Sequence, residues 1–450
     1  MKLIVIGGVA AGMSAASKAR RIMPEMEISV FEKTGYVSYG SCGLPYFIAG
    51  LIKEPEDLLA YPIDFFRKKR NIDVKIHHLV EKIEHKKKHI QVKDLSNNKT
   101  TIYTYDKLVI ATGAHAGVPR GLNEKKEGVF MLRTVEDGIL LRSFIKKNHL
   151  RKVVIVGAGN IGIEMVDVFH LLNMEITVVE KLPQVLPNLD GDMATLVEEH
   201  LKNYGVHIIK STGVKTFTGE KIVTGVILED ETELKTDLVL IATGAFPSVS
   251  LAKDAGIEVG GFGGIKVNGK METSLNDIYA AGDCIEVKHI ITNKGTYLPL
   301  GTTANKTGRI AGENAAGGNA VFTGIAGTNI LKTIDMEIAK TGLNTKEAEM
   351  EGYNSDSVLI KSLNRAHYYP GHKFIWLKII FDKKTGKLLG AQIVGEGASQ
   401  RIDIFTAAIY GKFTVKDLSR LDISYAPPFA PVWDPVLIAA NNAIKKIINK

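Results

Sequence analysis

The feature that most constrains this chain is a strand, glycine turn, helix and strand pattern that occurs twice. The first copy runs from "KLIVI" (2–6) through a glycine turn and a helix of small residues to "ISVFEK" (28–33). The second copy is "RKVVIVGAGNIGIEMVDVFHLLNMEITVVEK" (151–181). Buried strands alternate with helices in this way in doubly wound parallel sheets. The repeat therefore predicts two Rossmann-like, three-layer units in one chain.

Other segments support this organisation and add a third part. "YDKLVIATGA" (105–114) and "TDLVLIATGA" (236–245) each carry a buried strand into a glycine turn. In the C-terminal part the pattern changes to strands that we expect to alternate, such as "KFIWLKIIF" (373–381) and "LLGAQIVG" (388–395), followed by helices. The sequence therefore predicts an α/β protein with two Rossmann-like units and a C-terminal α+β domain that has its own sheet.

The second glycine turn has the full nucleotide-binding pattern. It contains Gly157, Gly159 and Gly162, and Glu180 closes the next strand. Such a turn brings backbone N–H groups and the positive end of a helix against a pyrophosphate. A carboxylate at the strand end accepts hydrogen bonds from a ribose 2′-hydroxyl and repels a 2′-phosphate. The turn therefore favours NADH over NADPH, although neighbouring Lys181 weakens this preference.

The first glycine turn is a variant of the second. Gly7 and Gly12 are present, Val9 stands in the place of the middle glycine, and Glu32 lies at the matching strand end. Two dinucleotide sites in one chain imply two cofactors. We expect FAD and a nicotinamide nucleotide, joined by hydride transfer.

A solitary cysteine lies in "YGSCGLPYF" (39–47), and the chain has only one other, Cys284. Cys42 cannot form an internal CxxC dithiol, so a redox role requires a sulfur partner from elsewhere. A helix that begins near Leu44 is expected to direct its N-terminus at the sulfur and lower its pKa. The alternative for a lone cysteine is a small buried side chain, which is the role we expect for Cys284.

Charge and composition exclude several classes of function. The formal net charge is +8, but the basic residues are scattered, and "HKKKH" (85–89) is expected to be a solvated hairpin turn. This charge suits a small polyanionic ligand and, without a nucleic-acid motif, does not indicate nucleic acid. No apolar run reaches the length of a membrane span, and no zinc-ligand spacing is present. Two cysteines suit a reducing compartment, so we expect a cytoplasmic protein without a metal or a membrane partner.

The motifs together resemble a known family. The two glycine turns, the paired "ATG" turns, "GAGNIGIE" and "YAAGDC" (279–284) are similar to those of FAD-dependent pyridine nucleotide-disulfide oxidoreductases. "SYGSCGLPYF" (38–47) and "YAPPFAPVWD" (425–434) look like its single-cysteine branch, which holds coenzyme A-disulfide reductases, CoA-dependent NAD(P)H sulfur or polysulfide reductases, NADH oxidases and NADH peroxidases. The resemblance implies a discontinuous FAD-binding domain, an NAD(P)H-binding domain and a dimerisation domain, over residues 1–112 with 245–322, 113–244, and 323–450 respectively.

The resemblance also assigns binding residues by position. The FAD residues would be Gly7, Ala10, Ala11, Glu32, Lys33, Val80, Ala111, Thr112, Gly113, Asp283, Thr302 and Ala304, with the segment 299–309 beside the isoalloxazine. The NAD residues would be Gly157, Gly159, Asn160, Ile161, Gly162, Glu180 and Gly244. The coenzyme A residues would be Ser14, Lys18, Arg21, Ser38, Ser41, Cys42, Arg70 and Asn305.

The implied reaction passes electrons from NAD(P)H through FAD to a mixed disulfide between Cys42 and coenzyme A. The acceptor that is finally reduced would be CoA disulfide, CoA persulfide or polysulfide. Tyr425 and Tyr368 of a partner subunit would assist the leaving thiolate, with Tyr369 as a register alternative for Tyr368. This arrangement requires a homodimer, because each active site borrows residues across the two-fold axis.

Two other functions remain open at this point. One is an NADH oxidase that reduces oxygen, and the other is a flavin-dependent redox sensor that binds a protein partner. Peroxidase and oxidase members carry a histidine just ahead of "AG" in the first glycine loop, where this chain has Ala10. This departure counts against a peroxidase and, more weakly, against an oxidase. A second departure is Asn160, which stands where many relatives have an aromatic gate in the nicotinamide loop.

Overall fold

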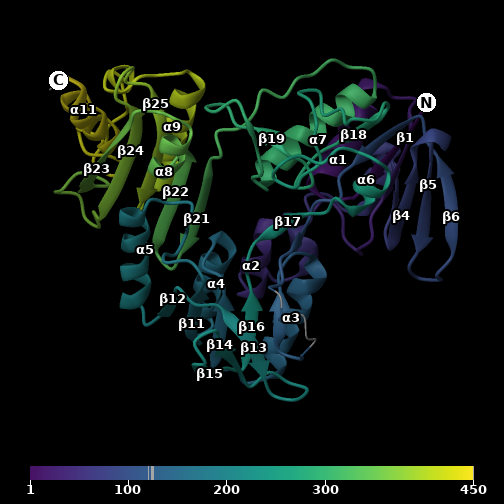
Figure 1. Cartoon of the computed structure of the whole chain (residues 1–450), viewed down its shortest axis with the longest axis horizontal. Coiled ribbons are helices and arrows are strands. Elements are labelled where there is room, and N and C mark those ends of the chain that lie inside the picture. Colours follow the sequence, from purple (N-terminus) through teal and green to yellow (C-terminus); the bar gives the residue numbers. More distant parts are fainter. Residues whose placement is uncertain (120, 123–125, 449–450) are drawn as a thin grey trace.

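The computed structural model describes residues 1–119, 121–122 and 126–448. Figure 1 shows three lobes: the N-terminal strands with α7 and β18 form one, a teal lobe lies below, and the C-terminal sheet forms the third. The predicted fold class is confirmed, since two lobes carry five-stranded parallel sheets and the third carries a five-stranded antiparallel sheet.

The first parallel sheet has the strand order β18-β7-β1-β2-β3. Its strands are β1 (Lys2–Ile6), β2 (Glu27–Phe31), β3 (Asp73–Lys75), β7 (Lys107–Ile110) and β18 (Ile278–Ala280). Helices α1 (Ala10–Ile22) and α7 (Gly301–Ala315) pack so closely that a Cβ atom at Gly312 would lie 2.0 Å from the Ala15 carbonyl oxygen. A small antiparallel sheet lies beside them, made of β4 (His78–Glu84), β5 (His89–Asp94) and β6 (Thr100–Thr104).

The second parallel sheet repeats this plan with the order β12-β11-β10-β16-β9. Its strands are β9 (Val129–Met131), β10 (Lys152–Val156), β11 (Glu175–Glu180), β12 (His207–Lys210) and β16 (Leu238–Ile241). The helices of this lobe are α3 (Val135–Lys147), α4 (Asn160–Leu171) and α5 (Gly191–Asn203). Its antiparallel sheet contains β13 (Val214–Thr218), β14 (Gly225–Leu228) and β15 (Glu233–Lys235).

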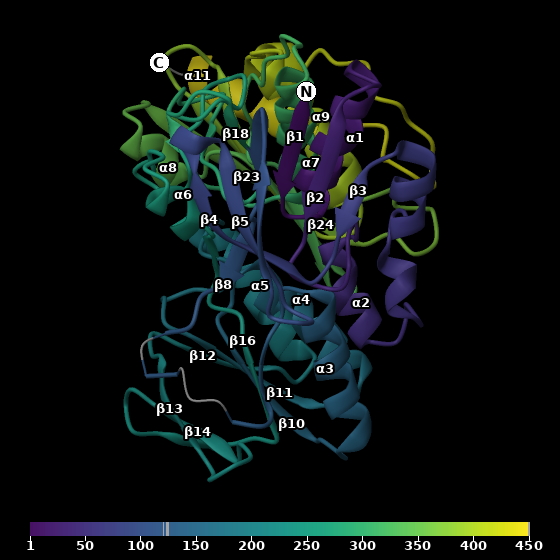
Figure 2. The same ribbon diagram turned by 90° about the vertical axis from the view of Figure 1, so that its right-hand side faces the viewer.

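Short elements connect these two lobes. β8 (Ala114–Ala116) and β17 (Ala245–Pro247) pair antiparallel where the chain enters and leaves the second lobe. The helix α2 (Leu44–Ile48) belongs to the first lobe in sequence but lies beside α3 and α4 of the second, as Figures 1 and 2 show. The remaining short elements are α6 (Ser250–Asp254), β19 (Val287–Lys288) and β20 (Gly295–Thr296).

The C-terminal sheet has the order β21-β22-β25-β24-β23. Its strands are β21 (Asn329–Thr333), β22 (Met336–Gly342), β23 (Ser355–Leu363), β24 (Phe374–Asp382) and β25 (Leu388–Val394). Its helices are α8 (Thr345–Met350), α9 (Ala398–Tyr410), α10 (Val415–Leu418) and α11 (Pro435–Ile448).

The expectation that β25 alternates between buried and exposed residues is wrong. Every residue of β25 is buried, because the strand lies in the centre of its sheet between β22 and β24. Helix α9 packs on it, and the start of α5 in the second lobe reaches it through the Asp190 amide, which donates to Gln392 Oε1 at 2.8 Å. The strand therefore has no solvent-facing side.

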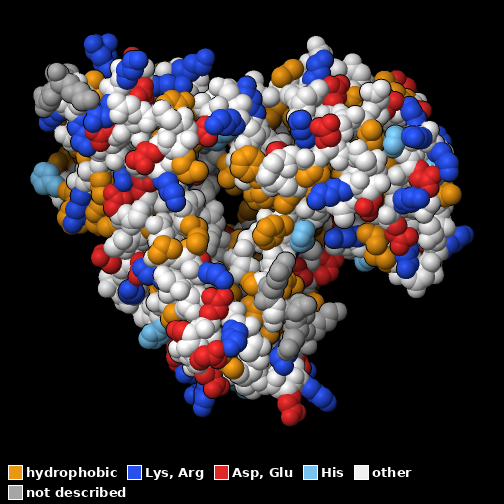
Figure 3. Space-filling view, in the orientation of Figure 1, with side chains coloured by type: hydrophobic (Ala, Val, Ile, Leu, Met, Phe, Trp, Pro, Cys, Tyr) orange, Lys and Arg blue, Asp and Glu red, His pale blue; other side chains and the backbone are white. Residues whose placement is uncertain are grey.

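The surface agrees with the scattered charge of the sequence. On the face shown in Figure 3, basic and acidic side chains are interspersed over all three lobes. The segment "HKKKH" forms a tight turn between β4 and β5, as predicted. Within the described part of the chain, no helix has the length and apolar character needed to cross a bilayer, and no group of three or more metal-ligating side chains is present.

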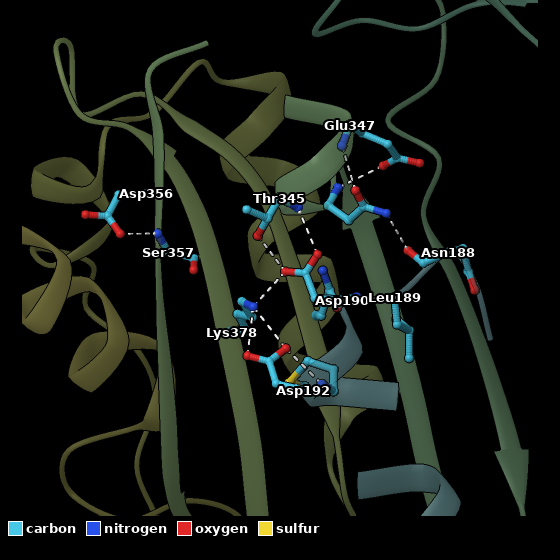
Figure 4. A network of polar contacts seen from close by, with 12 residues as sticks. Asn188, Leu189, Asp190, Asp192, Thr345, Glu347, Asp356, Ser357 and Lys378 are labelled. Atoms are coloured by element: carbon cyan, nitrogen blue, oxygen red, sulfur yellow. Dashed lines mark hydrogen bonds and ion pairs between the residues drawn. The ribbon is translucent and has the colours of Figure 1, made fainter. Parts of the chain in front are cut away.

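A buried lysine joins the second lobe to the C-terminal sheet. Lys378 of β24 lies 2.8 Å from a carboxylate oxygen of Asp190 and 2.8 Å from one of Asp192, at the start of α5 (Figure 4). Asp190 also accepts hydrogen bonds from the hydroxyl and the amide of Thr345, at 2.6 and 3.0 Å. Lys378 is buried and the side chain of Asp190 is only 9% exposed, so each charge depends on the other for compensation.

Replacing Lys378 with methionine should therefore destabilise the protein by about 3 kcal/mol, because it leaves uncompensated carboxylates in a buried contact. Thermal unfolding measures the effect. The matched control is Lys294→Met, which breaks a 2.8 Å ion pair with Glu351 whose lysine is 66% exposed; its cost should stay below about 1 kcal/mol. Equal stability of the two variants would contradict this role for Lys378.

Candidate active site

The two glycine turns have the same geometry in both parallel sheets. Gly7 has φ +102° and Gly157 has φ +105°, a region that glycine adopts without strain. A Cβ atom at Gly12 would lie 1.8 Å from the Gly7 carbonyl oxygen, and one at Gly162 would lie 2.0 Å from that of Gly157. Only glycine at these positions lets each helix start against the end of its strand.

The two strand-end carboxylates also match. Glu32 accepts a hydrogen bond from the Gly8 amide at 2.7 Å, and Glu180 accepts one from the Ala158 amide at 2.6 Å. Each carboxylate accepts a second bond, at 2.9 and 2.8 Å, from the amide two residues further along. Both side chains are buried, so each is held beside its glycine turn, where a nucleotide ribose would lie.

The middle position of the second turn leaves room for a phosphate. A Cβ atom at Gly159 would have no atom of the described residues within 4 Å, although the neighbouring glycines are tightly packed. Asn160 and Ile161 begin α4 directly after this turn, and both are exposed. The turn therefore fits a nicotinamide nucleotide whose pyrophosphate approaches the backbone.

Polar groups gather where the resemblance places the flavin. Arg133 donates to the Asp283 carboxylate at 2.5 Å and to the Ala114 carbonyl at 3.1 Å. The Tyr297 hydroxyl is buried without a hydrogen-bond partner among the described residues, and burial followed by Asp283 raises its pKa. Such an unsatisfied buried hydroxyl fits a site built for a polar cofactor. Sequence reasoning missed Arg133, which meets Asp283 only in the fold.

The other predicted FAD residues lie around the same sheet. Ala10 and Ala11 begin α1, and Thr112 follows β7 and donates its hydroxyl to the Ser248 carbonyl at 2.7 Å. The remaining predicted residues include three that are buried or half-buried, Val80, Ala111 and Ala304, and two that are exposed, Lys33 and Thr302. Gly113 and Gly244 have φ +67° and +111° and lie next to the β8–β17 pair. Gly244 is a predicted NAD residue, and the other residues named here fit FAD together with Glu32 and Gly7.

Cys42 lies in a single 3₁₀ turn, Ser41–Gly43, that leads directly into α2. Its side chain is exposed, yet the surrounding protein partly desolvates it. This desolvation, followed by the charges of Glu164 and Asp283, raises the pKa of the Cys42 thiol, while Arg133 and a backbone hydrogen bond act in the opposite direction. The prediction of a lowered pKa is therefore wrong. The helix that was expected to lower it has only 5 residues, and two carboxylates oppose it.

The second cysteine agrees with its predicted inert role. Cys284 is fully buried, and its thiol donates weak hydrogen bonds to the carbonyls of Ala281 and Ile110 at 3.3 and 3.6 Å. Burial raises its pKa to about 11. Cys42 is therefore the one exposed thiol of the chain.

Three arginines from distant segments lie close enough for their charges to interact. Burial, followed by the positive charges of Arg309 and Arg70, lowers the pKa of the Arg21 guanidinium. Arg21 comes from α1, Arg309 from α7, and Arg70 follows a π-helical turn whose Phe65 ring lies 5.3 Å below its guanidinium. Among the described residues none of the three has an acidic partner. We call Arg21, Arg70 and Arg309 the arginine cluster, and its uncompensated charge suits a phosphate.

The structure brings some of the other predicted coenzyme A residues together, and it pairs one of them with an acidic residue instead. Ser14 donates to Asn305 at 2.8 Å, so these two stand together as expected. Lys18 instead forms a 2.8 Å ion pair with Glu313, so its charge is already compensated. Arg309, the last residue of the predicted flavin segment 299–309, belongs to the arginine cluster. Next to it, a surface pocket of about 490 Å³ is lined in part by Lys18, Lys306, Arg309 and Tyr410.

The two predicted tyrosines lie together in the C-terminal lobe. The hydroxyl of Tyr368 is 2.7 Å from that of Tyr425, and both rings are exposed. Tyr369 has no such bond to Tyr425 among the described residues. Large apolar side chains, Phe429, Val432 and Trp433, are exposed on the same segment. Exposed apolar surface of this kind is typical of a protein interface.

A comparison with known protein families shows to which family the chain belongs. The pattern described as "Pyridine nucleotide-disulphide oxidoreductase" matches residues 1–308. The chain belongs to this family. The dimerisation domain of the pyridine nucleotide-disulphide oxidoreductases matches residues 329–435, which indicates a homodimer. Membership also implies FAD and NAD(P)H as cofactors, in agreement with the two glycine turns.

Several relatives are similar to this chain over nearly its whole length. The NAD(P)H coenzyme A polysulfide/persulfide reductase of Pyrococcus horikoshii is 41% identical and covers 98% of this chain and 97% of its own. An NADH oxidase of Methanocaldococcus jannaschii is 38% identical over 100% of both chains. The structure of a NAD-dependent persulfide reductase from A. fulgidus superposes with a TM-score of 0.96 at 38% identity, over 100% of this chain and 84% of that one. This oxidoreductase chain is thus similar to reductases and to an oxidase.

Proposed function

We propose that the protein is an NAD(P)H-dependent reductase that uses coenzyme A and reduces CoA disulfide, CoA persulfide or polysulfide through Cys42. The observation that carries this proposal is that the chain has both one exposed thiol and an arginine cluster without acidic partners among the described residues. FAD, when bound, accepts a hydride from the reduced nicotinamide and delivers two electrons to a disulfide. The chain itself supplies the thiol of Cys42, the arginine cluster and the two glycine turns.

The chain has no second accessible thiol beside Cys42. Cys284 is fully buried, so Cys42 cannot close a disulfide with it unless the fold opens. A small thiol from solution must then provide the second sulfur. Reduction of the mixed disulfide breaks its S–S bond and leaves two thiolates, and Cys42 then attacks the next disulfide and expels one thiolate.

Coenzyme A fits the rest of the site. It carries a 3′-phosphate and a pyrophosphate, and the arginine cluster offers three guanidiniums without an acidic partner among the described residues. Guanidinium groups bind phosphates bidentately and keep their charge, so the cluster would hold the nucleotide end of the ligand. Ser14, Asn305, Ser38 and Ser41 would line the path from there toward Cys42.

A partner subunit would complete the site. The hydrogen-bonded pair of Tyr368 and Tyr425 is exposed beside apolar side chains of a dimerisation domain. In a homodimer this pair would face Cys42 of the other subunit and donate a proton to the leaving thiolate. For the nicotinamide nucleotide, the buried Glu180 at the ribose position favours NADH over NADPH.

The proposal is tested first by mass spectrometry of the intact purified protein before and after a reductant. A loss of mass equal to one coenzyme A identifies the thiol partner. Anaerobic oxidation of NADH by CoA disulfide and by polysulfide then measures turnover. The named NADH oxidase relative supports a second candidate, reduction of oxygen. NADH consumption with oxygen that is as fast as with every disulfide acceptor would favour the oxidase.

The arginine cluster gives a separate prediction. Arg309→Ala should raise the KM for CoA disulfide about tenfold, because a charged contact to a phosphate is lost, and should leave the KM for pantethine, which lacks the nucleotide, nearly unchanged. Lys86→Ala in the exposed "HKKKH" turn is the matched control for loss of one positive charge. If the two variants gave the same KM for CoA disulfide, the cluster would not be the phosphate site.

A further inference from the structure

The lysine that follows the strand-end carboxylate of the second glycine turn has an acidic partner. Lys181 is the residue next to Glu180, and its ammonium lies 2.8 Å from a carboxylate oxygen of Glu229, directly after β14. The side chains of Lys181 and Glu229 are 72% and 47% exposed, so a ligand from solution can reach both. An unpaired lysine here would attract the 2′-phosphate of NADPH, but the charge of this lysine is already compensated.

The backbone fixes Glu229 at this position. Its amide donates to the Gly213 carbonyl at 2.8 Å, and the Gly213 amide donates to Glu229 Oε2 at 3.3 Å. A Cβ atom at Gly213 would lie 2.9 Å from Glu229 Oε1, so the carboxylate lies directly against this loop. The amide of Thr212 in the same loop donates to the Glu180 carbonyl at 3.4 Å. Glu229 is therefore held beside the strand end by the loop that follows β12.

The second lysine beside Glu180 is paired as well. Lys210 of β12 stands opposite Glu180 in the register of the parallel sheet. Its ammonium lies 2.6 Å from a carboxylate oxygen of Glu198 in α5. The lysine next to Glu180 in the chain and the lysine opposite it in the sheet therefore both lack an uncompensated charge that a phosphate could bind.

We propose that Glu229 is a specificity-determining residue that selects NADH over NADPH by pairing with Lys181. The pair removes a cation that a 2′-phosphate would need, and it places a second carboxylate at this strand end. A ribose 2′-hydroxyl can bond to Glu180 and leaves the pair intact, whereas a 2′-phosphate would have to break the pair and approach two negative charges. The inference deepens the proposed function, and it rests on that function only for the nicotinamide nucleotide.

The test compares the affinities of the holoenzyme for 2′,5′-ADP, the phosphorylated half of NADPH, and for 5′-ADP, by isothermal titration calorimetry. Excess coenzyme A is present throughout to fill the proposed coenzyme A site, so that the two probes report on the second glycine turn. In Glu229→Gln the ratio of the two affinities should shift toward 2′,5′-ADP by about three- to tenfold, because an exposed ion pair is released and one like charge is removed. A merely structural role would change both affinities together.

A kinetic measurement checks the same selectivity with the complete nucleotides. Bound FAD is reduced anaerobically by NADPH and by NADH without a sulfur acceptor, and the nucleotide concentration that gives the half-maximal rate is determined for each. The ratio of these two concentrations should shift in favour of NADPH by the same factor in Glu229→Gln.

Two further variants separate the released lysine from the loss of charge alone. Adding Lys181→Met to Glu229→Gln should return the affinity ratio to within about twofold of the wild type, because the released cation is then absent. Glu231→Gln, which breaks the ion pair of Glu231 with Lys215 two residues further along the chain, is the matched control and should keep the wild-type ratio.

An unchanged ratio in Glu229→Gln, or an equal shift in the double variant or in Glu231→Gln, overturns the inference. Binding of the adenosine phosphates involves neither Cys42 nor a sulfur acceptor. The inference can therefore fail while turnover of CoA disulfide succeeds, and the reverse also holds.

Discussion

Replacing Cys42 with serine should abolish turnover of CoA disulfide and leave FAD bound and reducible by NADH. The hydroxyl cannot form a mixed disulfide with coenzyme A, so electrons that reach the flavin have no sulfur acceptor in the protein. We expect the anaerobic rate to fall by on the order of a thousandfold or more, as for loss of a catalytic nucleophile. Single-turnover reduction of the flavin and steady-state turnover, measured on the same preparation, separate the two half-reactions.

Cys284→Ser is the matched control. This thiol is fully buried and donates to the carbonyl oxygens of Ala281 and Ile110, and a hydroxyl can make the same bonds. The control should still reduce its flavin with NADH and turn over CoA disulfide, and it should keep the coenzyme A adduct. If Cys42→Ser reduced CoA disulfide at the wild-type rate, the thiol would have no part in catalysis and the proposed function would fail.

Replacing Gly162 with alanine should remove NADH binding and weaken the second lobe. The added Cβ atom would lie 2.0 Å from the Gly157 carbonyl oxygen, so α4 must move away from the end of β10. Overpacking of this kind costs about 1–3 kcal/mol or more and displaces the amides that would hold the pyrophosphate. The measurements are thermal unfolding and reduction of bound FAD by NADH, and dithionite serves to show that the flavin itself remains competent.

The variant Gly159→Ala tests whether the cofactor approaches the backbone of this turn, without disturbing the packing of the turn. Its Cβ atom would meet no described atom within 4 Å, so thermal stability should remain that of the wild type. If the pyrophosphate occupies that space, the KM for NADH should rise about tenfold or more. An unchanged KM in Gly159→Ala would show that the nucleotide does not approach the backbone here.

Much of the fold could be predicted from the sequence because its signals are local. The repeated glycine turns, with their acidic strand ends, predict two parallel sheets, and Glu32 and Glu180 indeed occupy equivalent positions. The buried character of β25 could not be predicted from its own residues. It depends on the position of β25 between β22 and β24 and on α5, which comes from a distant part of the chain.

The missed parts of the site are contacts between distant segments. Arg309 joins Arg21 only because α7 packs against α1, and Arg133 meets Asp283 across the junction of two lobes. The predicted direction of the Cys42 pKa was wrong for the same reason. A sequence motif shows the helix that follows the thiol, but not the desolvation of Cys42 by the fold or the charge of Glu164 from another lobe.

The order of strands in the first parallel sheet has a consequence for synthesis on the ribosome. Its edge strand β18 and the helix α7 are translated after every strand of the second sheet, which lies between residues 129 and 241. A nascent chain can therefore assemble the second sheet while the first still lacks an edge and a covering helix. We expect ribosome-bound chains that stop near residue 290, so that β16 has left the exit tunnel, to protect β10 from protease and to leave β1 susceptible.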